Sequence, residues 1–173
     1  KDEITAIKYN GVSIDMLLNM TVDDSIKFFR KYNQTKIVNK LLPLQSVGLG
    51  YVSLGQSSNT LSGGEAQRIK LASFIGKGDQ IDKTFFIFDE PTTGLHFHDV
   101  KKLLNTFDKL IRMGHSILVI EHNLDMISCA DHIIDLGPEG GDKGGNIIAE
   151  GSPEDIIKNK RSYTGQDLKK KIV

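Results

Sequence analysis

Two adjacent carboxylates, Asp89 and Glu90, are the residues of this chain best suited to chemistry, and they directly follow the apolar run FFIF at 85–88. Such a run is typical of a buried parallel strand whose carboxyl end opens into a crevice. An aspartate at that edge can hold Mg²⁺, and a glutamate beside it can polarise a water molecule. The pair therefore predicts a hydrolytic site at the end of this strand.

A glycine-rich segment, TLSGGEAQR at 60–68, precedes the carboxylates by about twenty residues. Ser62 is expected to cap a helix, and Glu65, three residues later, completes the pattern of a capping box. Gly63 and Gly64 carry no side chains, so an anion can approach the first backbone N–H groups of the helix closely. The segment predicts a helix start that binds phosphate.

Together the two segments are typical of ABC-type ATPases, and longer motifs make the resemblance more specific. They are LSGGEAQRIKLA, DEPTTGLH, VGLGYVSLGQ, VIEHNLD, ADHIIDLGPEGGDKGG and SYTGQDLK. In their order and spacing these motifs resemble the UvrA family, the damage-recognition subunit of the bacterial excinuclease. The resemblance covers nearly the whole chain and corresponds to the last part of the family's second ATPase module.

The resemblance implies an α/β fold, a fragment of an ABC-type P-loop NTPase with a largely parallel sheet flanked by helices. It implies two parts: a helical signature subdomain over 1–78, which ends in the LSGGE helix, and the C-terminal part of the ATP-binding core over 79–173. Residues 92–95 take the position of the family's D-loop, which communicates between two ATP sites.

The resemblance also assigns roles to single residues. It implies that Asp89 completes the Walker B site and helps to hold Mg²⁺, usually through water, and that Glu90 is the general base for the attacking water. His122 resembles the switch histidine that contacts the γ-phosphate; a lone histidine after a strand is more often structural, and that alternative stays open. Ser62, Gly63, Gly64 and Glu65 resemble the signature that completes the ATP site of another module.

For the intact protein, the resemblance implies binding and hydrolysis of ATP with Mg²⁺, a homodimer, binding of damaged double-stranded DNA and loading of the UvrB partner in nucleotide excision repair. A cytoplasmic location and no membrane partner are expected. Two alternatives remain: the nucleotide-binding half of another ABC protein, such as a transporter or an SMC-like protein, and a regulatory ABC module that does not hydrolyse nucleotide. The motifs LSGGE and GPEGGDKGG disfavour the transporter.

Two motifs of the intact family are missing from the sequence. It contains no GxxxxGK[ST], the loop that cradles the α- and β-phosphates and supplies a lysine. The family's zinc cysteines are absent as well, so no zinc is expected here. This chain is therefore expected to hold one flank of an ATP site and to be inactive as an isolated fragment.

Composition sets only broad limits on function. The 173 residues carry 22 basic and 22 acidic side chains, so no overall field draws the chain to nucleic acid or to a membrane surface. Hydrophobic residues make up 39%, which suffices for a core. The single cysteine, Cys129, is expected to be a small packed residue, and no apolar run approaches the roughly 20 residues of a membrane span.

Periodicity and turn residues predict the elements that must position the site. We expect helices over 22–32, 36–47, 65–75, 99–113, 124–129 and from Ser152, and strands over 4–9, 84–88, 116–120, 133–136 and 147–150. The spacing of strand, helix and strand between 84 and 120 predicts a βαβ unit with parallel strands. The glycine-rich stretch 137–145 predicts a hairpin tip. The tail from 160 is polar, and its lysines at 169–171 predict a solvated end.

Overall fold

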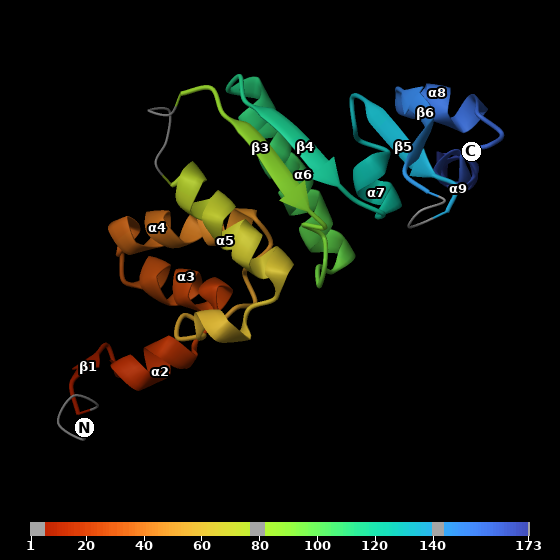
Figure 1. Ribbon diagram of the computed structural model, residues 1–173. Coiled ribbons are helices and arrows are strands. Elements are labelled where there is room, and N and C mark those ends of the chain that lie inside the picture. Colours follow the sequence, from red (N-terminus) through yellow and green to blue (C-terminus); the bar gives the residue numbers. More distant parts are fainter. Residues whose placement is uncertain (1–5, 77–81, 140–143, 173) are drawn as a thin grey trace. The chain divides into compact units, whose positions relative to one another are not determined.

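The computed structural model describes residues 6–76, 82–139 and 144–172. Its contacts divide the chain into two compact units, 1–120 and 121–173. The subdomain boundary predicted between 78 and 79 lies outside the described residues. Figure 1 gives the order of the elements along the chain.

The first unit begins with a small hairpin and a short helix. Strands β1 (Lys8–Tyr9) and β2 (Val12–Ser13) pair antiparallel, and α2 (Ile14–Asn19) follows directly. Asn10 and Gly11 form the turn with φ values of 49° and 83°, the left-handed conformation that a two-residue hairpin turn requires. Of the strand predicted over 4–9, the described residues confirm only Lys8–Tyr9.

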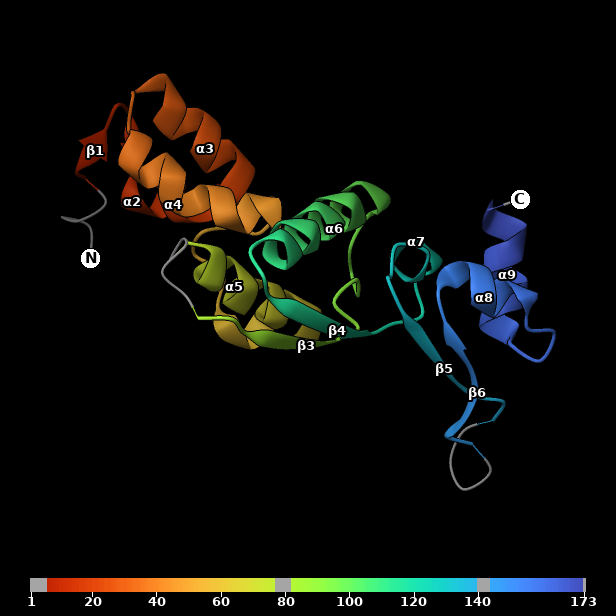
Figure 2. The same cartoon turned by 90° about the horizontal axis from the view of Figure 1, so that it is seen from above.

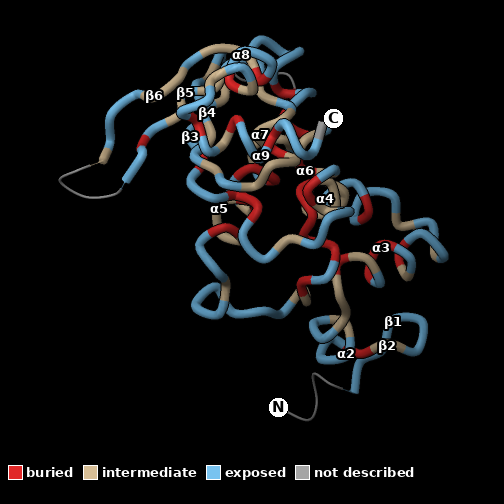
Figure 3. Tube along the Cα trace, turned by 90° about the vertical axis from the view of Figure 1, so that its right-hand side faces the viewer, coloured by how far each residue is buried: buried red, intermediate tan, exposed pale blue. Residues whose placement is uncertain are grey.

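Two helices, α3 (Val22–Lys31) and α4 (Thr35–Ser46), pack against each other after this hairpin. The hydroxyl of Thr21 accepts a hydrogen bond of 3.1 Å from the backbone N–H of Asp24 and so caps α3. Pro43 lies inside α4 without ending it. The buried core between the helices, which lies along one face of α3 in Figure 3, consists of Val22, Ile26, Phe29 and Val38.

The βαβ unit follows a 3₁₀ turn at Ser58–Thr60 and helix α5 (Gly63–Ile75). Strand β3 (Phe85–Asp89), helix α6 (Phe97–Arg112) and strand β4 (Ser116–Ile120) succeed one another. The two strands pair in parallel with Ile87 opposite Leu118, as the spacing predicts. The carboxyl ends of both strands therefore meet at one edge of the sheet.

Only one face of this two-stranded sheet is covered. Helices α5 and α6 lie on the same side of the strands in Figure 2, and rings from both helices contact β3: Phe74 with Phe86 at 4.6 Å between centroids, and Phe107 with Phe88 at 4.9 Å. The opposite face exposes Phe85, Ile87, Leu118 and Ile120, each by 42% or more. The expectation of fully buried strands is wrong for this face, because the described residues place both helices on the other one.

The second unit joins a short helix, a hairpin and two further helices. After α7 (Leu124–Ile127), strands β5 (Ile133–Gly137) and β6 (Asn146–Gly151) pair antiparallel, which confirms the predicted hairpin. Part of its tip, 140–143, lies outside the described residues. Helix α8 (Pro153–Lys158) begins where the hydroxyl of Ser152 accepts from the N–H of Asp155.

The chain ends in a helix that the sequence interpretation missed. Residues of the polar tail form α9 (Tyr163–Ile172), in which Leu168 is fully buried. The lysines at 169–171 are exposed, as predicted. The carboxylate of Asp135 on β5 accepts hydrogen bonds from the hydroxyls of Ser162, at 2.6 Å, and Thr164, at 2.9 Å. These two bonds hold the start of α9 to the hairpin, and the helix packs against α8.

Two expectations from the composition can be compared with the structure. Cys129 is exposed, so its predicted packing is wrong. The apolar residues beside it in sequence do not cover it, although its neighbour Met126 is buried. Within the described part of the chain, no helix combines the length and the apolar character that crossing a bilayer would require.

Candidate functional site

The glycine-rich segment starts helix α5 with the predicted capping box. The hydroxyl of Ser62 accepts from the N–H of Glu65 at 3.3 Å, and the Glu65 carboxylate accepts from the N–H of Ser62 at 2.7 Å. At Gly63, an added Cβ would meet no atom within 4 Å. The first turn of α5 is therefore open to a ligand at this position, as an anion-binding helix start requires.

Gly64 has a different role from the one its sequence suggests. It is buried, and an added Cβ would lie 3.3 Å from the carbonyl oxygen of Thr93 and 3.4 Å from that of Glu90. The first contact is tighter than an ordinary van der Waals distance, and the second lies at its lower limit. The absence of a side chain at Gly64 thus lets α5 approach the backbone that follows β3, and Gly63 leaves the first turn of the helix open.

The two carboxylates stand where β3 ends, and both are exposed. The N–H of Glu90 donates to the carbonyl of Ile120 at 2.9 Å, which extends the parallel pairing one residue past the strand. Glu90 has a φ of 45°, a left-handed conformation that is uncommon for a residue other than glycine. Backbone strain of this kind concentrates at functional sites, and here it falls on the predicted base.

The helix start and the strand end surround one hollow of about 290 Å³. It is lined by Gly63, Gly64, Gln67, Asp89, Glu90 and Thr93. Ser62 and Glu65 lie at the adjoining helix start without lining it. The structure thus brings the signature and the carboxylates together within a single unit, although the sequence interpretation assigned them to two different ATP sites.

A polar cluster stands behind the helix start. The hydroxyl of Tyr51 donates to the Glu65 carboxylate at 2.6 Å. This hydrogen bond, with that from the Ser62 N–H, lowers the pKa of Glu65, so its carboxylate stays charged. Burial raises the pKa of Tyr51 and lowers that of Arg68, while the Tyr51 and Glu65 groups oppose the change at Arg68.

Sequence reasoning missed two residues of this site, Gln67 and Arg68. The Gln67 side chain donates to the carbonyl of Asp89 at 3.0 Å and accepts from the Asp89 N–H at 3.2 Å. Arg68 is fully buried, and its Nη1 donates to the carbonyls of Pro91, at 2.6 Å, and Thr93, at 3.2 Å. The available signal was the spacing of Arg68, which shares the buried face of α5 with Gly64, Leu71 and Ala72.

The comparisons with known proteins agree on one family. No family model matches the chain. The UvrABC system protein A of Clostridium acetobutylicum is 58% identical over 170 residues, and that of Rickettsia typhi is 55% identical over 171 residues; these alignments cover 98% and 99% of the chain. The chain belongs to the UvrA family. It spans about 18% of the length of these relatives.

Solved structures support the fold of this UvrA segment. UvrA2 from Deinococcus radiodurans superimposes with a TM-score of 0.80 at 36% identity, covering 98% of the chain and 20% of that structure. A bacterial Atm1-family ABC exporter with ATP bound gives a TM-score of 0.51 at 22% identity, covering 91% of the chain and 27% of that structure. The second likeness shows the fold alone. The predicted α/β fold of an ABC ATPase fragment is confirmed.

His122 lies in the second unit of the UvrA segment, two residues after β4. The neighbouring Glu121 carboxylate accepts from the backbone N–H groups of His122, at 2.9 Å, and Asn123, at 3.0 Å. Glu121 is thus engaged with the chain that follows the strand. Because His122 and the carboxylates belong to different units, the contact of His122 with the γ-phosphate stays a prediction.

The carboxylate edge suits a hydrated cation better than a fully protein-bound one. Among the described residues of the UvrA segment, no group of three or more histidine, cysteine, aspartate or glutamate residues is placed to hold a metal. Mg²⁺ usually keeps several waters and takes one or two carboxylates together with substrate phosphates. Exposed Asp89 at the rim of the hollow fits that chemistry.

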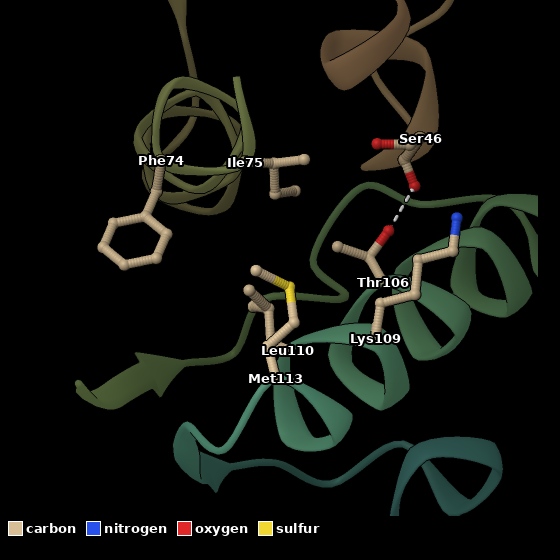
Figure 4. Close-up of a pocket in the computed structure, with 7 residues that line it drawn as sticks. All are labelled: Ser46, Phe74, Ile75, Thr106, Lys109, Leu110 and Met113. Carbon is tan, nitrogen blue, oxygen red and sulfur yellow. Dashed lines mark hydrogen bonds between the residues drawn. The ribbon is translucent and has the colours of Figure 1, made fainter. Parts of the chain in front are cut away.

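A second hollow of the UvrA segment, about 230 Å³, lies between α4, α5 and α6 (Figure 4). Apolar side chains of Phe74, Ile75, Leu110 and Met113 form most of its lining, and the Thr106 hydroxyl donates to the carbonyl of Ser46 beside them. It contains no carboxylate and no helix start. The candidate site is therefore the hollow at Asp89 and Glu90.

Proposed function

We propose that this chain is the C-terminal part of the second ATPase module of a UvrA protein that hydrolyses ATP in nucleotide excision repair. One observation carries the proposal: Asp89 and Glu90 line a hollow at the carboxyl end of β3, in a chain 58% identical to a UvrABC system protein A. In this proposal, 1–78 form the signature subdomain and 79–173 belong to the ATP-binding core.

The residues of the hollow divide the work of phosphoryl transfer. Asp89 would hold Mg²⁺ through water, and the bound cation would neutralise charge on the phosphate oxygens. Glu90 would orient the attacking water and accept its proton. Phosphoryl transfer leaves little covalent work to a protein, so positioning water and charge constitutes most of the mechanism.

The start of α5 would serve a second nucleotide. Ser62, Gly63, Gly64 and Glu65 would present the N-terminal end of the helix to the γ-phosphate of ATP bound at another module, across a head-to-tail interface. In the family pattern that module is the first ATPase half of the same protein. His122 would contact the γ-phosphate, as the switch histidine of the family does.

The remaining proposals concern the intact protein. It would act as a homodimer in the cytoplasm, bind damaged double-stranded DNA and use ATP to control the loading of UvrB. The 173 residues alone would be inactive, because the sequence contains no GxxxxGK[ST] to cradle the α- and β-phosphates. The family membership favours this function over a transporter module.

Glu90→Gln in the intact protein tests the proposal directly. The amide keeps the size of the side chain and loses the base, so hydrolysis should fall by about 10²–10⁴-fold while ATP binding persists. Steady-state turnover and equilibrium nucleotide binding measure the two effects, and binding to damaged and undamaged duplexes tests the repair role. Unchanged turnover in Glu90→Gln would exclude Glu90 as the base.

His122→Ala in the intact protein tests the histidine separately. A side chain that contacts the γ-phosphate should affect hydrolysis more than nucleotide affinity, because charge rearranges there during transfer. Turnover should fall, with ADP affinity unchanged. Equal losses of ATP and ADP affinity at normal turnover would assign His122 a structural role.

A further inference from the structure

The first half of α5 contacts the backbone that carries the carboxylates at three positions on two successive turns. Gly64 packs on the carbonyls of Glu90 and Thr93, Gln67 bonds both backbone groups of Asp89, and Arg68 donates to two carbonyls beyond it. We call this contact region, formed by residues 64, 67 and 68 with 89–93, the signature junction. All of it lies within the first unit.

Gln67 acts on Asp89 in the manner of a neighbouring strand. Its amide offers one donor and one acceptor to the N–H and C=O of the same residue, the pattern by which a strand pairs with an edge. Asp89 is the last residue of β3 and pairs with Ile120 on the other side. The backbone at the strand end is therefore held from both sides, by β4 and by α5.

The burial of Arg68 lowers the stability of the fold more than its hydrogen bonds would suggest. Its guanidinium is fully buried, yet its Nε and Nη2 atoms find no hydrogen-bond partner among the described residues, and only Nη1 is used. Buried donors left unsatisfied cost stability, and well-packed apolar replacements of buried charges are often neutral or stabilising. Interactions with Tyr51 and Glu65 offset part of this cost. In addition, Arg68 fixes the distance between α5 and the carbonyls of Pro91 and Thr93.

We propose that Gln67 and Arg68 are positioning residues that make the start of α5 and residues 89–93 move as one body. A phosphate contact at Gly63 would then shift Glu90, because the junction leaves no freedom between the helix start and the strained backbone of Glu90. The signature thereby reports the nucleotide of one site to the base of another. This inference rests on the proposed ATPase function.

The test uses the intact protein with Gln67→Glu and Arg68→Met. Gln67→Glu keeps the shape but turns a carboxylate oxygen toward the Asp89 carbonyl, and Arg68→Met keeps apolar bulk without the donors. Misplacement of a catalytic group by about 1 Å can cost 10²-fold, so we expect kcat to fall by at least about tenfold. KM for ATP should stay within about twofold in Arg68→Met, since Arg68 does not line the hollow.

Lys70→Met is the matched control, because Lys70 is an exposed residue of the same helix outside the junction. It should leave kcat unchanged. Amide hydrogen exchange of the peptide spanning 89–95, measured without nucleotide, should accelerate in both junction variants and not in the control. A structural role alone would instead lower the unfolding midpoint, and we expect that midpoint to be retained in Gln67→Glu.

The possible outcomes distinguish a failure of the signature-junction proposal from a failure of the proposed ATPase function. If the unmodified protein does not hydrolyse ATP, the proposed function fails, and the exchange measurement still tests the junction. Junction variants with wild-type kcat and wild-type exchange would overturn the inference, as would an equal loss in Lys70→Met. If Arg68→Met fails to fold, Gln67→Glu, whose side chain is partly exposed, decides the question.

Discussion

Helices α3 and α5 both belong to the first unit, but different kinds of interaction hold them in place. Helix α3 buries Val22, Ile26 and Phe29 against α4. Helix α5 buries Gly64, Arg68, Leu71 and Ala72, which follow nearly the same spacing, but its first half contacts backbone carbonyls instead of apolar side chains. One spacing therefore serves two purposes.

The difference concerns precision. Apolar packing is strong but weakly directional, so the α3–α4 pair has only to exclude water. Hydrogen bonds fix distances to within a few tenths of an ångström and contribute modestly to stability. The α3–α4 pair should therefore set how stable the unit is, and the signature junction should set where Asp89 and Glu90 stand.

Ile26→Ala should destabilise the first unit more than any single substitution at the start of α5. Ile26 is 1% exposed between α3 and α4, and truncating such a residue typically costs about 2–5 kcal/mol. Urea denaturation of the 173-residue chain measures the loss. Ile37→Ala, on the exposed side of α4, is the control and should cost far less. Equal costs at the two positions would show that the α3–α4 core contributes little.

Ser62→Ala should have a smaller effect, confined to the start of α5. It removes the hydroxyl that accepts from the N–H of Glu65, and loss of such a cap costs about 1 kcal/mol. Ser73→Ala, an exposed change in the interior of the same helix, should be neutral within error. A neutral Ser62→Ala would mean that the capping box does not stabilise this helix start.

Glu65→Gln should show the smallest effect, one that depends on pH. The Tyr51 hydroxyl and the Ser62 N–H lower the folded-state pKa of Glu65 below its ordinary 4.5, so the unfolded chain binds the proton more readily. The stabilisation is complete above pH 4.5 and is lost as pH falls through the lowered pKa. The difference in unfolding free energy between wild type and Glu65→Gln should therefore shrink on acidification, and a constant difference would exclude the linkage.

Periodicity and capping signals predicted most of the fold because those signals are local. The capping box at Ser62 involves residues only three apart in sequence. The parallel pairing of β3 with β4 joins residues 31 apart, but it follows from the uninterrupted succession of strand, helix and strand. Helix α9 was missed because its partner is distant: Asp135 holds Ser162 and Thr164 across 27 and 29 residues. Its one fully buried leucine gives too weak a pattern to recognise.

The site was predicted to the same extent and for the same reason. The apolar run at 85–88 is what predicts Asp89 and Glu90 as candidate site residues. Gln67 and Arg68 are not predicted in this way, because their partners are backbone groups 22 to 25 residues away, and any residue type supplies a carbonyl. The left-handed φ of Glu90 is equally hidden, since glutamate carries no preference for it.

The uncovered face of the β3–β4 sheet has a practical consequence for handling the chain. Phe85, Ile87, Leu118 and Ile120 present contiguous apolar surface to water, a feature that promotes self-association. Sulfate and phosphate strengthen the burial of apolar surface, so precipitation should begin at lower concentrations of those salts than for a Phe85→Lys variant. Solution conditions for this segment should accordingly be chosen by light scattering before any calorimetry is attempted.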